Sequence, residues 1–258
     1  MAVTATQLTV ARGTFRLAVE TFVADGSGTA VVGPNGAGKT TLLLALQGLL
    51  PCGGRVERPA DCAGVFAQPA VLRGSAIWNI MVVLQSALGL DVRAARQRAA
   101  AALRAVDLAG EADGEARRLS AGQRQRLALA RALALEPRAL LLDEPFANID
   151  ADGRFALRCL VADYVARSGC ALVLATQTLA DVTPLCRRLV LLDRGRAAER
   201  LDVAGLAGST HPYLRALLAE GRVAGWRSAA DPRIGRPPDA GQGPGVYRQY
   251  FPKVEDPA

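Results

Sequence analysis

The feature that most constrains the fold is a glycine-rich stretch that separates a short apolar segment from a helical pattern. Residues 29–32 are typical of a buried strand, and residues 40–50, before Pro51, are typical of a helix. Glycines let the intervening backbone wrap around phosphate oxygens, so that successive N–H groups and the helix N-terminus face the anion. The sequence therefore predicts a phosphate-binding loop with the pattern G-x-x-x-x-G-K-T. Its residues are Gly33, Pro34, Asn35, Gly36, Ala37, Gly38, Lys39, Thr40 and Thr41.

Two side chains at the end of this loop have predicted roles. We expect Lys39 to reach the β- and γ-phosphates of a nucleotide and the Thr40 hydroxyl to ligate Mg²⁺. The alternative is a glycine-rich turn that binds nothing. The complete motif, in its strand and helix context, argues against that alternative.

An acidic pair follows a second apolar segment. Asp143 and Glu144 close the run 139–142, which is typical of a strand buried on both faces of a parallel sheet. Ligands of open α/β sheets bind at the carboxyl ends of such strands. We expect Asp143 to hold Mg²⁺ through water and Glu144 to polarise an attacking water molecule. A solvated turn before Pro145 is the alternative, and the upstream phosphate loop favours catalysis.

A third motif lies between these two. Residues 119–123, Leu-Ser-Ala-Gly-Gln, precede an amphipathic helical stretch and resemble the signature motif of the ATP-binding cassette (ABC) family. Ala121 stands where that family usually has glycine. A helix capped by Ser120 that only packs is the alternative. The fixed order of all three motifs favours the ABC resemblance.

The resemblance implies a fold and a domain organisation. We expect an α/β fold of the P-loop NTPase class, an ABC-type nucleotide-binding domain with a mixed sheet core and an inserted helical subdomain. The ATPase domain would span residues 1–221, beginning with short strands, and the helical subdomain about 69–118. Residues 222–258 are rich in Pro, Gly and Arg and predict a mobile tail.

The resemblance also assigns residues outside the three motifs. Gln68 matches the glutamine loop, which reaches Mg²⁺ and the attacking water, and Asp150 matches the aspartate loop along the dimer interface. Gln177 stands where the family has a switch histidine, and the only histidine in the chain is His211. A glutamine amide can donate a hydrogen bond but cannot carry positive charge. We therefore expect hydrolysis to persist, with Glu144 as the base, at a reduced rate.

An aromatic residue upstream of the phosphate loop stacks on adenine in this family. Phe15 is the candidate, and Phe22 is the other nearby aromatic. Aromatic residues are core residues by default, so a core role for Phe15 remains the alternative.

The resemblance implies that two cassettes close head to tail around two ATP molecules. One protomer would supply the phosphate loop, Gln68, Asp143 and Glu144 to each site, and the other Ser120, Gly122 and Gln123. The expected Mg²⁺ ligands are Thr40, Gln68 and Asp143. The expected catalytic residues are Glu144, Gln68 and Gln177.

The composition and sequence patterns indicate the cellular location and the kinds of partner to expect. Its 258 residues contain no apolar run long enough for a membrane span, and the N-terminus lacks the pattern of a signal peptide. We expect a cytoplasmic protein. The formal charge of +7 comes from arginines spread along the chain, and no nucleic-acid recognition module is visible, so no nucleic-acid partner is expected.

A single cassette without a span favours the motor subunit of an ABC transporter whose permease is a separate chain. Residues 68–80 look like the glutamine-loop region of importer motors, especially those for tungstate-like oxyanions, which also use an extracytoplasmic substrate-binding protein. Val71, Leu72 and Trp78 are candidates for the permease contact, with a core role as the alternative. A soluble ABC ATPase that acts on ribosomes or DNA, and the motor of an exporter, are the other functions considered.

Overall fold

The computed structural model describes the backbone of residues 1–223 and the side chains of residues 1–220. Nine strands form one sheet in the spatial order β4-β1-β2-β9-β8-β3-β7-β6-β5. The predicted tail, 222–258, lies almost entirely outside the described residues. The strands are β1 (Ala2–Arg12), β2 (Phe15–Asp25), β3 (Thr29–Val32), β4 (Gly53–Glu57), β5 (Cys62–Val65), β6 (Ala139–Asp143), β7 (Ala171–Ala175), β8 (Arg188–Asp193) and β9 (Arg196–Asp202).

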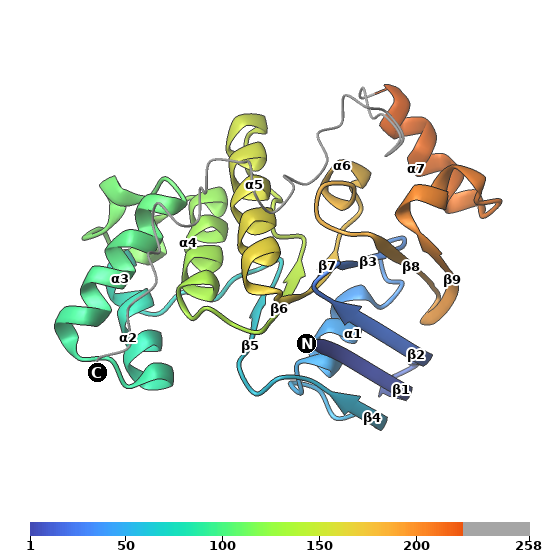
Figure 1. Ribbon diagram of the computed structural model, residues 1–258, viewed down its shortest axis with the longest axis horizontal. Helices are drawn as coiled ribbons and strands as arrows, with labels where there is room; N and C mark the ends of the chain where they lie inside the picture. The colour runs from blue at the N-terminus through green and yellow to red at the C-terminus, as the bar shows by residue number, and fades with distance from the viewer. Residues whose placement is uncertain (224–258) are drawn as a thin grey trace.

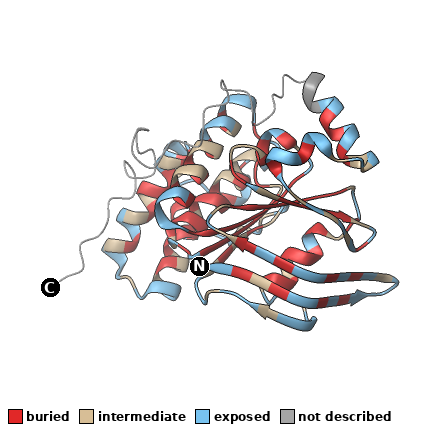
Figure 2. Cartoon of the chain, turned by 45° about the vertical axis from the view of Figure 1, so that its right-hand side comes forward, coloured by how far each residue is buried: buried red, intermediate tan, exposed pale blue. Residues whose placement is uncertain are grey.

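The centre of the sheet is parallel. β3 pairs with β7 and β8, β7 pairs with β6, and β6 pairs with β5, all in the parallel sense. Neighbouring residues of these strands face two different cores: Leu141 packs in one, while Leu140 and Leu142 pack in the other. Figure 2 shows these strands buried along their length. Burial on both faces explains why they read as continuous apolar runs.

The edge of the sheet that begins with β4 is antiparallel. β1 and β2 form a hairpin of two strands with 11 residues each, joined at Gly13 and Thr14, and β4 pairs with β1. The prediction of short strands here was wrong, because an alternating buried and exposed pattern continues through both strands. One face of the hairpin packs on the helix α1 (Lys39–Leu46), which lies between the hairpin and the central strands (Figure 1).

Helix α1 is shorter than the predicted 40–50. It ends at Leu46, where Gln47 caps it and Gly48 takes a positive φ of 77°. A left-handed glycine after the last turn is a common helix stop, because no other residue adopts that conformation so easily.

The other face of the sheet is covered by the longer helices. α2 to α5 group at the β5 end, and α6 and α7 lie near β8 (Figure 1). The predicted final helix, 212–218, extends further, to Val223. None of the described helices is long and apolar enough to cross a membrane. The helices are α2 (Ala76–Leu88), α3 (Val92–Ala105), α4 (Ala121–Ala134), α5 (Ala151–Ser168), α6 (Leu179–Val182) and α7 (Pro212–Val223), with 3₁₀ turns η1 (Ala109–Glu111), η2 (Ala116–Arg118) and η3 (Val203–Gly208).

A buried asparagine holds the start of α2. Asn79 is fully buried, and its Oδ1 accepts from the Leu72 backbone N–H at 2.8 Å. Its Nδ2 donates to the Leu72 carbonyl at 3.2 Å and to the Ser75 carbonyl at 3.0 Å. The side chain thus satisfies backbone groups of the segment before α2, in addition to the backbone hydrogen bonds that this segment makes with residues 114–116.

We predict that Asn79→Ala destabilises the fold by about 2–3 kcal/mol, because it removes these hydrogen bonds and leaves polar backbone groups without partners. Chemical denaturation of the purified protein measures the change. Ser86→Ala, at an exposed position of the same helix, is the control and should alter stability by less than about 0.5 kcal/mol. Equal effects of the two variants would contradict this role of Asn79.

Candidate functional site

The glycine-rich loop connects β3 to α1 and has an unusual backbone. Gly33 and Gly38 have φ angles of 153° and 106°. A Cβ atom at Gly33 would collide with the Leu192 carbonyl oxygen of β8, and one at Gly38 would lie 2.8 Å from the Phe15 ring. Both positions therefore require glycine. The loop backbone lies close against its neighbours and forms the cradle that the sequence predicts.

Lys39 occupies the centre of this cradle. Its ammonium donates to the carbonyl oxygens of Gly33, at 2.7 Å, and Pro34, at 3.2 Å. Burial lowers the pKa of Lys39, and the negative charges of Glu144 and Asp143 oppose that shift. The positive charge therefore sits at the phosphate-binding loop and beside the acidic pair.

Thr40 and Asp143 meet although they are 103 positions apart. The Thr40 hydroxyl donates to Asp143 Oδ2 at 2.5 Å. Asp143 ends β6 and is 2% exposed, and burial raises its pKa, against the hydrogen bond from Thr40 and the charge of Lys39. Hydroxyl and carboxylate oxygens are the ligands that Mg²⁺ takes from proteins, a few at a time and together with phosphate oxygens. This pair could therefore hold the ion of a Mg²⁺–nucleotide complex.

Glu144 follows directly, in a left-handed backbone conformation with φ of 47°. Its N–H donates to the Ala175 carbonyl at 2.9 Å, and Gln125 Nε2 donates to its carbonyl at 3.4 Å. In the side chain, Oε2 accepts from the Thr176 hydroxyl at 3.4 Å, while Oε1 is buried without a hydrogen-bond partner among the described residues. A buried carboxylate oxygen in this state is a free acceptor for a water proton.

Several groups tune the carboxylate of Glu144. Burial raises its pKa, and the charge of Lys39 and hydrogen bonding from Gln177 oppose the rise. A carboxylate with a raised pKa is a stronger base, because the optimal base has a pKa closer to the working pH.

Gln177, at the position of the family's switch histidine, is exposed and follows β7. Its Nε2 donates to Asn35 Oδ1 in the phosphate-binding loop at 2.8 Å. The side chain therefore contacts the phosphate-binding loop. Asn35 gains a partner that the sequence did not indicate.

The signature residues lie at the start of α4. The Ser120 side chain accepts from the Gln123 N–H at 3.2 Å, and the Gln123 side chain accepts from the Ser120 N–H at 2.9 Å. This reciprocal capping box is the structural role, a helix capped by Ser120, that the sequence left as an alternative. The side-chain oxygen of Gln123 is engaged in it. Ser120 remains exposed at the helix N-terminus, where N–H groups favour an anion.

The signature packs against the aspartate loop. A Cβ atom at Gly122 would lie 2.5 Å from the Asn148 carbonyl oxygen, so this position also needs glycine. Asp150 caps α5 by accepting from the Gly153 N–H at 2.8 Å. Together these segments line a hollow of about 400 Å³ that contains no residue of the phosphate-binding loop. Its lining comprises Asp107, Leu108, Ser120, Gly122, Gln123, Arg126, Asn148, Ile149 and Asp150.

Phe15 and Gln68 lie at the margins of the site. The half-buried ring of Phe15 contacts the loop at Gly38 and packs on the core of the hairpin, whereas Phe22 is 2% exposed and belongs to the core. Gln68 is exposed after β5, at the edge of the sheet where Asp143 ends β6, and makes no hydrogen bond with the described residues. The structure therefore places Phe15 at the loop but does not bring Gln68 into contact with Thr40 or Asp143.

Two buried polar residues were missed by the sequence reasoning. Thr176 is fully buried beside Glu144, and Gln125 is 2% exposed beneath its backbone. A threonine that closes an apolar strand gave a weak signal for the first. Nothing in the local pattern of α4 distinguished Gln125 from its partly buried neighbours.

Comparison with known proteins places these features in a family. Residues 18–147 match the model of the family described as ABC transporter. The aliphatic sulfonates import ATP-binding protein SsuB 3 of Paraburkholderia xenovorans (strain LB400) is 38% identical over 206 residues, which is 79% of each chain. The molybdenum import ATP-binding protein ModC of Mycobacterium tuberculosis (strain H37Rv) is 39% identical over 211 residues, 73% of this chain and 57% of that protein.

The fold has solved counterparts. A dimeric ATP-binding cassette in a post-hydrolysis state, bound to ADP and Pi, superimposes with a TM-score of 0.69 at 22% identity, over 78% of this chain and 98% of that one. The predicted P-loop NTPase fold with a mixed sheet is confirmed. The chain therefore belongs to the ABC transporter family, and its phosphate-binding loop, acidic pair and signature are those of the family's ATPase domain.

Proposed function

We propose that this chain is the ATP-hydrolysing motor of an importer for sulfonates or small oxyanions, bound at the cytoplasmic face of the membrane to a separate permease. The similar SsuB and ModC proteins, import subunits for aliphatic sulfonates and for molybdenum, support the direction and the class of cargo. One observation supports the motor itself. Lys39, the Thr40–Asp143 pair and Glu144 meet at one edge of the sheet.

Each of these residues has a chemical task. Lys39 binds the β- and γ-phosphates, and the Thr40 and Asp143 oxygens hold Mg²⁺, which neutralises phosphate charge when bound. The Glu144 carboxylate accepts a proton from the attacking water through its unpartnered oxygen. Gln177 donates a hydrogen bond near the terminal phosphate, and Gln68 moves in from its exposed position. Phe15 contacts the adenine.

The active site is completed by a second copy of the chain. Ser120 and Gly122 line a hollow that shares no residue with the phosphate-binding loop, which supports a site divided between two chains. A head-to-tail dimer brings the signature of one protomer onto the phosphates held by the other. The N-terminus of α4 then faces the terminal phosphate, where its N–H groups stabilise negative charge.

The permease contact involves the apolar residues before and at the start of α2. Leu72 and Trp78 are 44% and 42% exposed, while Val71 packs partly on the core. Asn79 fixes Leu72, and a Cβ atom at Gly74 would lie 2.8 Å from the Trp78 ring, so this surface is held in place. Rigid exposed apolar side chains favour a protein partner.

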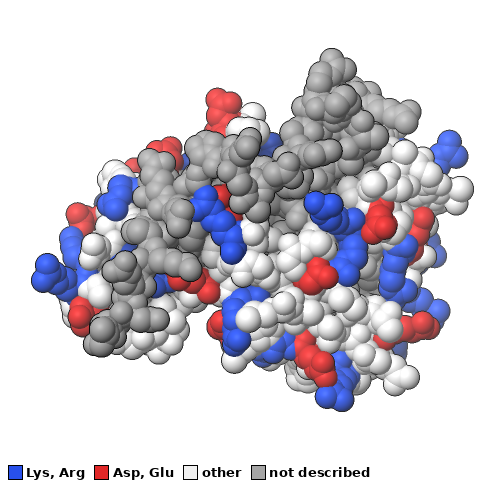
Figure 3. All heavy atoms as spheres, viewed as in Figure 1, with Lys and Arg blue, Asp and Glu red and all other residues white. Residues whose placement is uncertain are grey.

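The charge distribution gives no support to a nucleic-acid partner on the face seen in Figure 3. Lysine and arginine side chains there are interspersed with aspartate and glutamate side chains. Nucleic-acid binding surfaces instead gather positive charge on one face or along one helix.

The proposed function is tested with a tagged Glu144→Gln variant, which should bind ATP without hydrolysing it. We expect a multi-span permease to copurify from detergent-solubilised native cells. Adding Leu72→Asp should abolish that capture, because a buried charge is costly at an apolar interface. Phe155→Asp, at a residue of α5 that is 65% exposed, is the matched control and should leave capture intact. Ribosomes or DNA in place of a permease would refute the transport function.

The switch position is tested separately. We predict that Gln177→His raises ATP turnover several-fold, because a histidine can carry the positive charge that a glutamine amide lacks. Steady-state phosphate release at saturating ATP measures the effect. Gln177→Ala should reduce turnover below that of the parent. A histidine variant no faster than the parent would show that Gln177 is compensated by its neighbours, such as Asn35.

The composite site predicts complementation between two inactive variants. Lys39→Ala disables the phosphate-binding loop, and Ser120→Asp disables the signature by repelling phosphate while keeping a good helix cap. Each variant alone should be inactive, with ATP binding retained in Ser120→Asp. A mixture should regain activity, because a mixed dimer contains one intact site. No recovery in a mixture shown to contain mixed dimers would contradict the shared site.

A further inference from the structure

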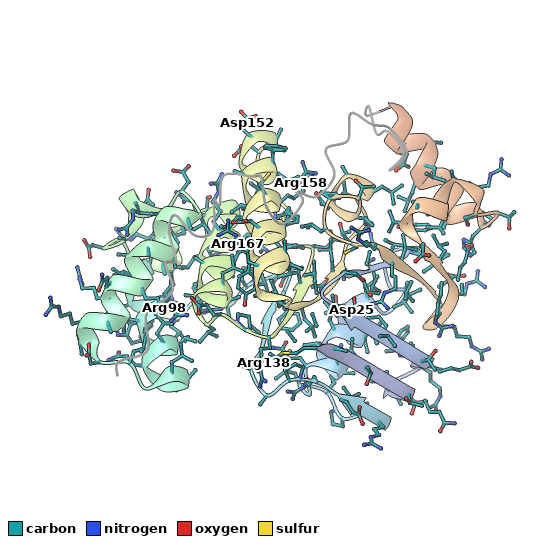
Figure 4. All side chains as sticks on the ribbon, viewed as in Figure 1. Asp25, Arg98, Arg138, Asp152, Arg158 and Arg167 are labelled. Atoms are coloured by element: carbon teal, nitrogen blue, oxygen red, sulfur yellow. The ribbon has the colours of Figure 1, made fainter. Side chains whose placement is uncertain are left out.

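A buried aspartate behind the active site takes no part in the proposed hydrolysis of ATP. Asp181 of α6 is 4% exposed, and its Oδ1 accepts from Arg158 Nη1 of α5 at 3.2 Å. The same arginine nitrogen donates to the Ala180 carbonyl at 2.8 Å. Figure 4 shows Arg158 on the side of α5 that faces α6. The ion pair therefore ties the short helix α6 to the long helix α5.

A second arginine strengthens this attachment. Burial raises the pKa of Asp181, and the charges of Arg158 and Arg154 lower it. A buried carboxylate without such partners would be costly, so the two arginines stabilise its ionised form. The arginines of α5 thus hold Asp181 in place without any contribution from the active site.

Thr176 connects the helix held by the Asp181–Arg158 ion pair to the Glu144 carboxylate. Its hydroxyl is fully buried, donates to Glu144 Oε2 at 3.4 Å and accepts from the Thr178 N–H at 3.1 Å. Thr178 is the N-cap residue of α6, so its N–H ties the Thr176 hydroxyl to the start of the helix that carries Asp181. A hydroxyl has one proton and can donate to one acceptor at a time. Because Arg158 already donates to Asp181, the proton is available to Glu144.

Among the described residues, the ionisable groups that act on Glu144 do not connect it to Asp181. Lys39 and Asp143 act from the phosphate-binding loop and β6. Tyr213 of α7 is also near, since the charge of Glu144 contributes to raising the pKa of its hydroxyl, after burial. None of these three touches the Asp181 ion pair through a hydrogen bond in the described residues.

We propose that Asp181 and Thr176 are positioning residues for ATP hydrolysis: the Asp181–Arg158 pair fixes α6 against α5, and the Thr176 hydroxyl held there orients the Glu144 carboxylate. This inference rests on the proposed role of Glu144 as the base. The N-cap residue of α5, Asp150, lines the signature hollow, so α5 connects that hollow to the Asp181–Arg158 pair.

Three variants of the full-length chain test the proposal. Thr176→Val removes the hydroxyl at nearly constant volume, Thr176→Ser retains it, and Asp181→Asn removes the charge. We expect kcat for ATP hydrolysis to fall about tenfold in Thr176→Val and Asp181→Asn, a barrier increase of about 1.4 kcal/mol. KM for ATP should stay within about twofold, because the phosphate-binding loop is unchanged. Thr176→Ser should recover most of kcat.

The separation of kcat from KM distinguishes positioning from a general loss of structure. A loss of structure would weaken nucleotide binding together with kcat, and serine at position 176 would not restore the rate selectively. Arg167→Gln, which removes a partly exposed ion pair with Asp163 on the same helix, is the control and should leave kcat and KM unchanged.

The outcomes are distinct. Thr176→Val with the parent's kcat would overturn the positioning role, and so would a Thr176→Ser variant as slow as Thr176→Val. Nucleotide binding and thermal melting of each variant identify a loss of fold, and the Thr176 pair decides the matter if Asp181→Asn does not fold. A Glu144→Gln variant as active as the parent would instead refute the assignment of Glu144 in the proposed function.

Discussion

The hydrogen bond between the Thr40 hydroxyl and the Asp143 carboxylate is the contact on which the candidate active site depends. It joins the helix that follows the phosphate-binding loop to the strand that ends in the acidic pair. The two segments meet because β3, β7 and β6 are parallel neighbours, so their carboxyl ends lie at one edge of the sheet. Without that pairing, the loop and the carboxylates would be two unrelated polar features of the chain.

The electrostatics of this edge follow from burial. Lys39, Asp143 and Glu144 are removed from much of the solvent, and burial shifts the pKa of each toward its neutral form. Their mutual attraction opposes those shifts, which keeps one positive and two negative groups together in a region of low dielectric. Such a cluster responds strongly to the arrival of a polyanionic phosphate. The buried Oε1 of Glu144 is the acceptor left available for chemistry.

Helix α5 connects the signature region to α6. The helix carries Asp150 at its N-terminus, beside the signature, and Arg158 two turns later, beside α6. Its length and buried face make it a rigid element that can transmit displacement between these points. Thr176 and Gln177, which follow β7, contact Glu144 and the phosphate-binding loop. Gln177 contacts the phosphate-binding loop through a hydrogen bond, and its amide carries no positive charge.

Local sequence determined the phosphate-binding loop, the acidic pair, the signature helix and the family, because these depend on residue types at short, fixed spacing. It also indicated the central strands, which are apolar on both faces. Tertiary structure alone decided which polar residues act together. The contacts of Gln177 with Asn35, of Thr176 with Glu144 and of Asp181 with Arg158 join segments 142, 32 and 23 positions apart. No local pattern encodes such distances, since they arise from parallel strand pairing and from the packing of α6 on α5.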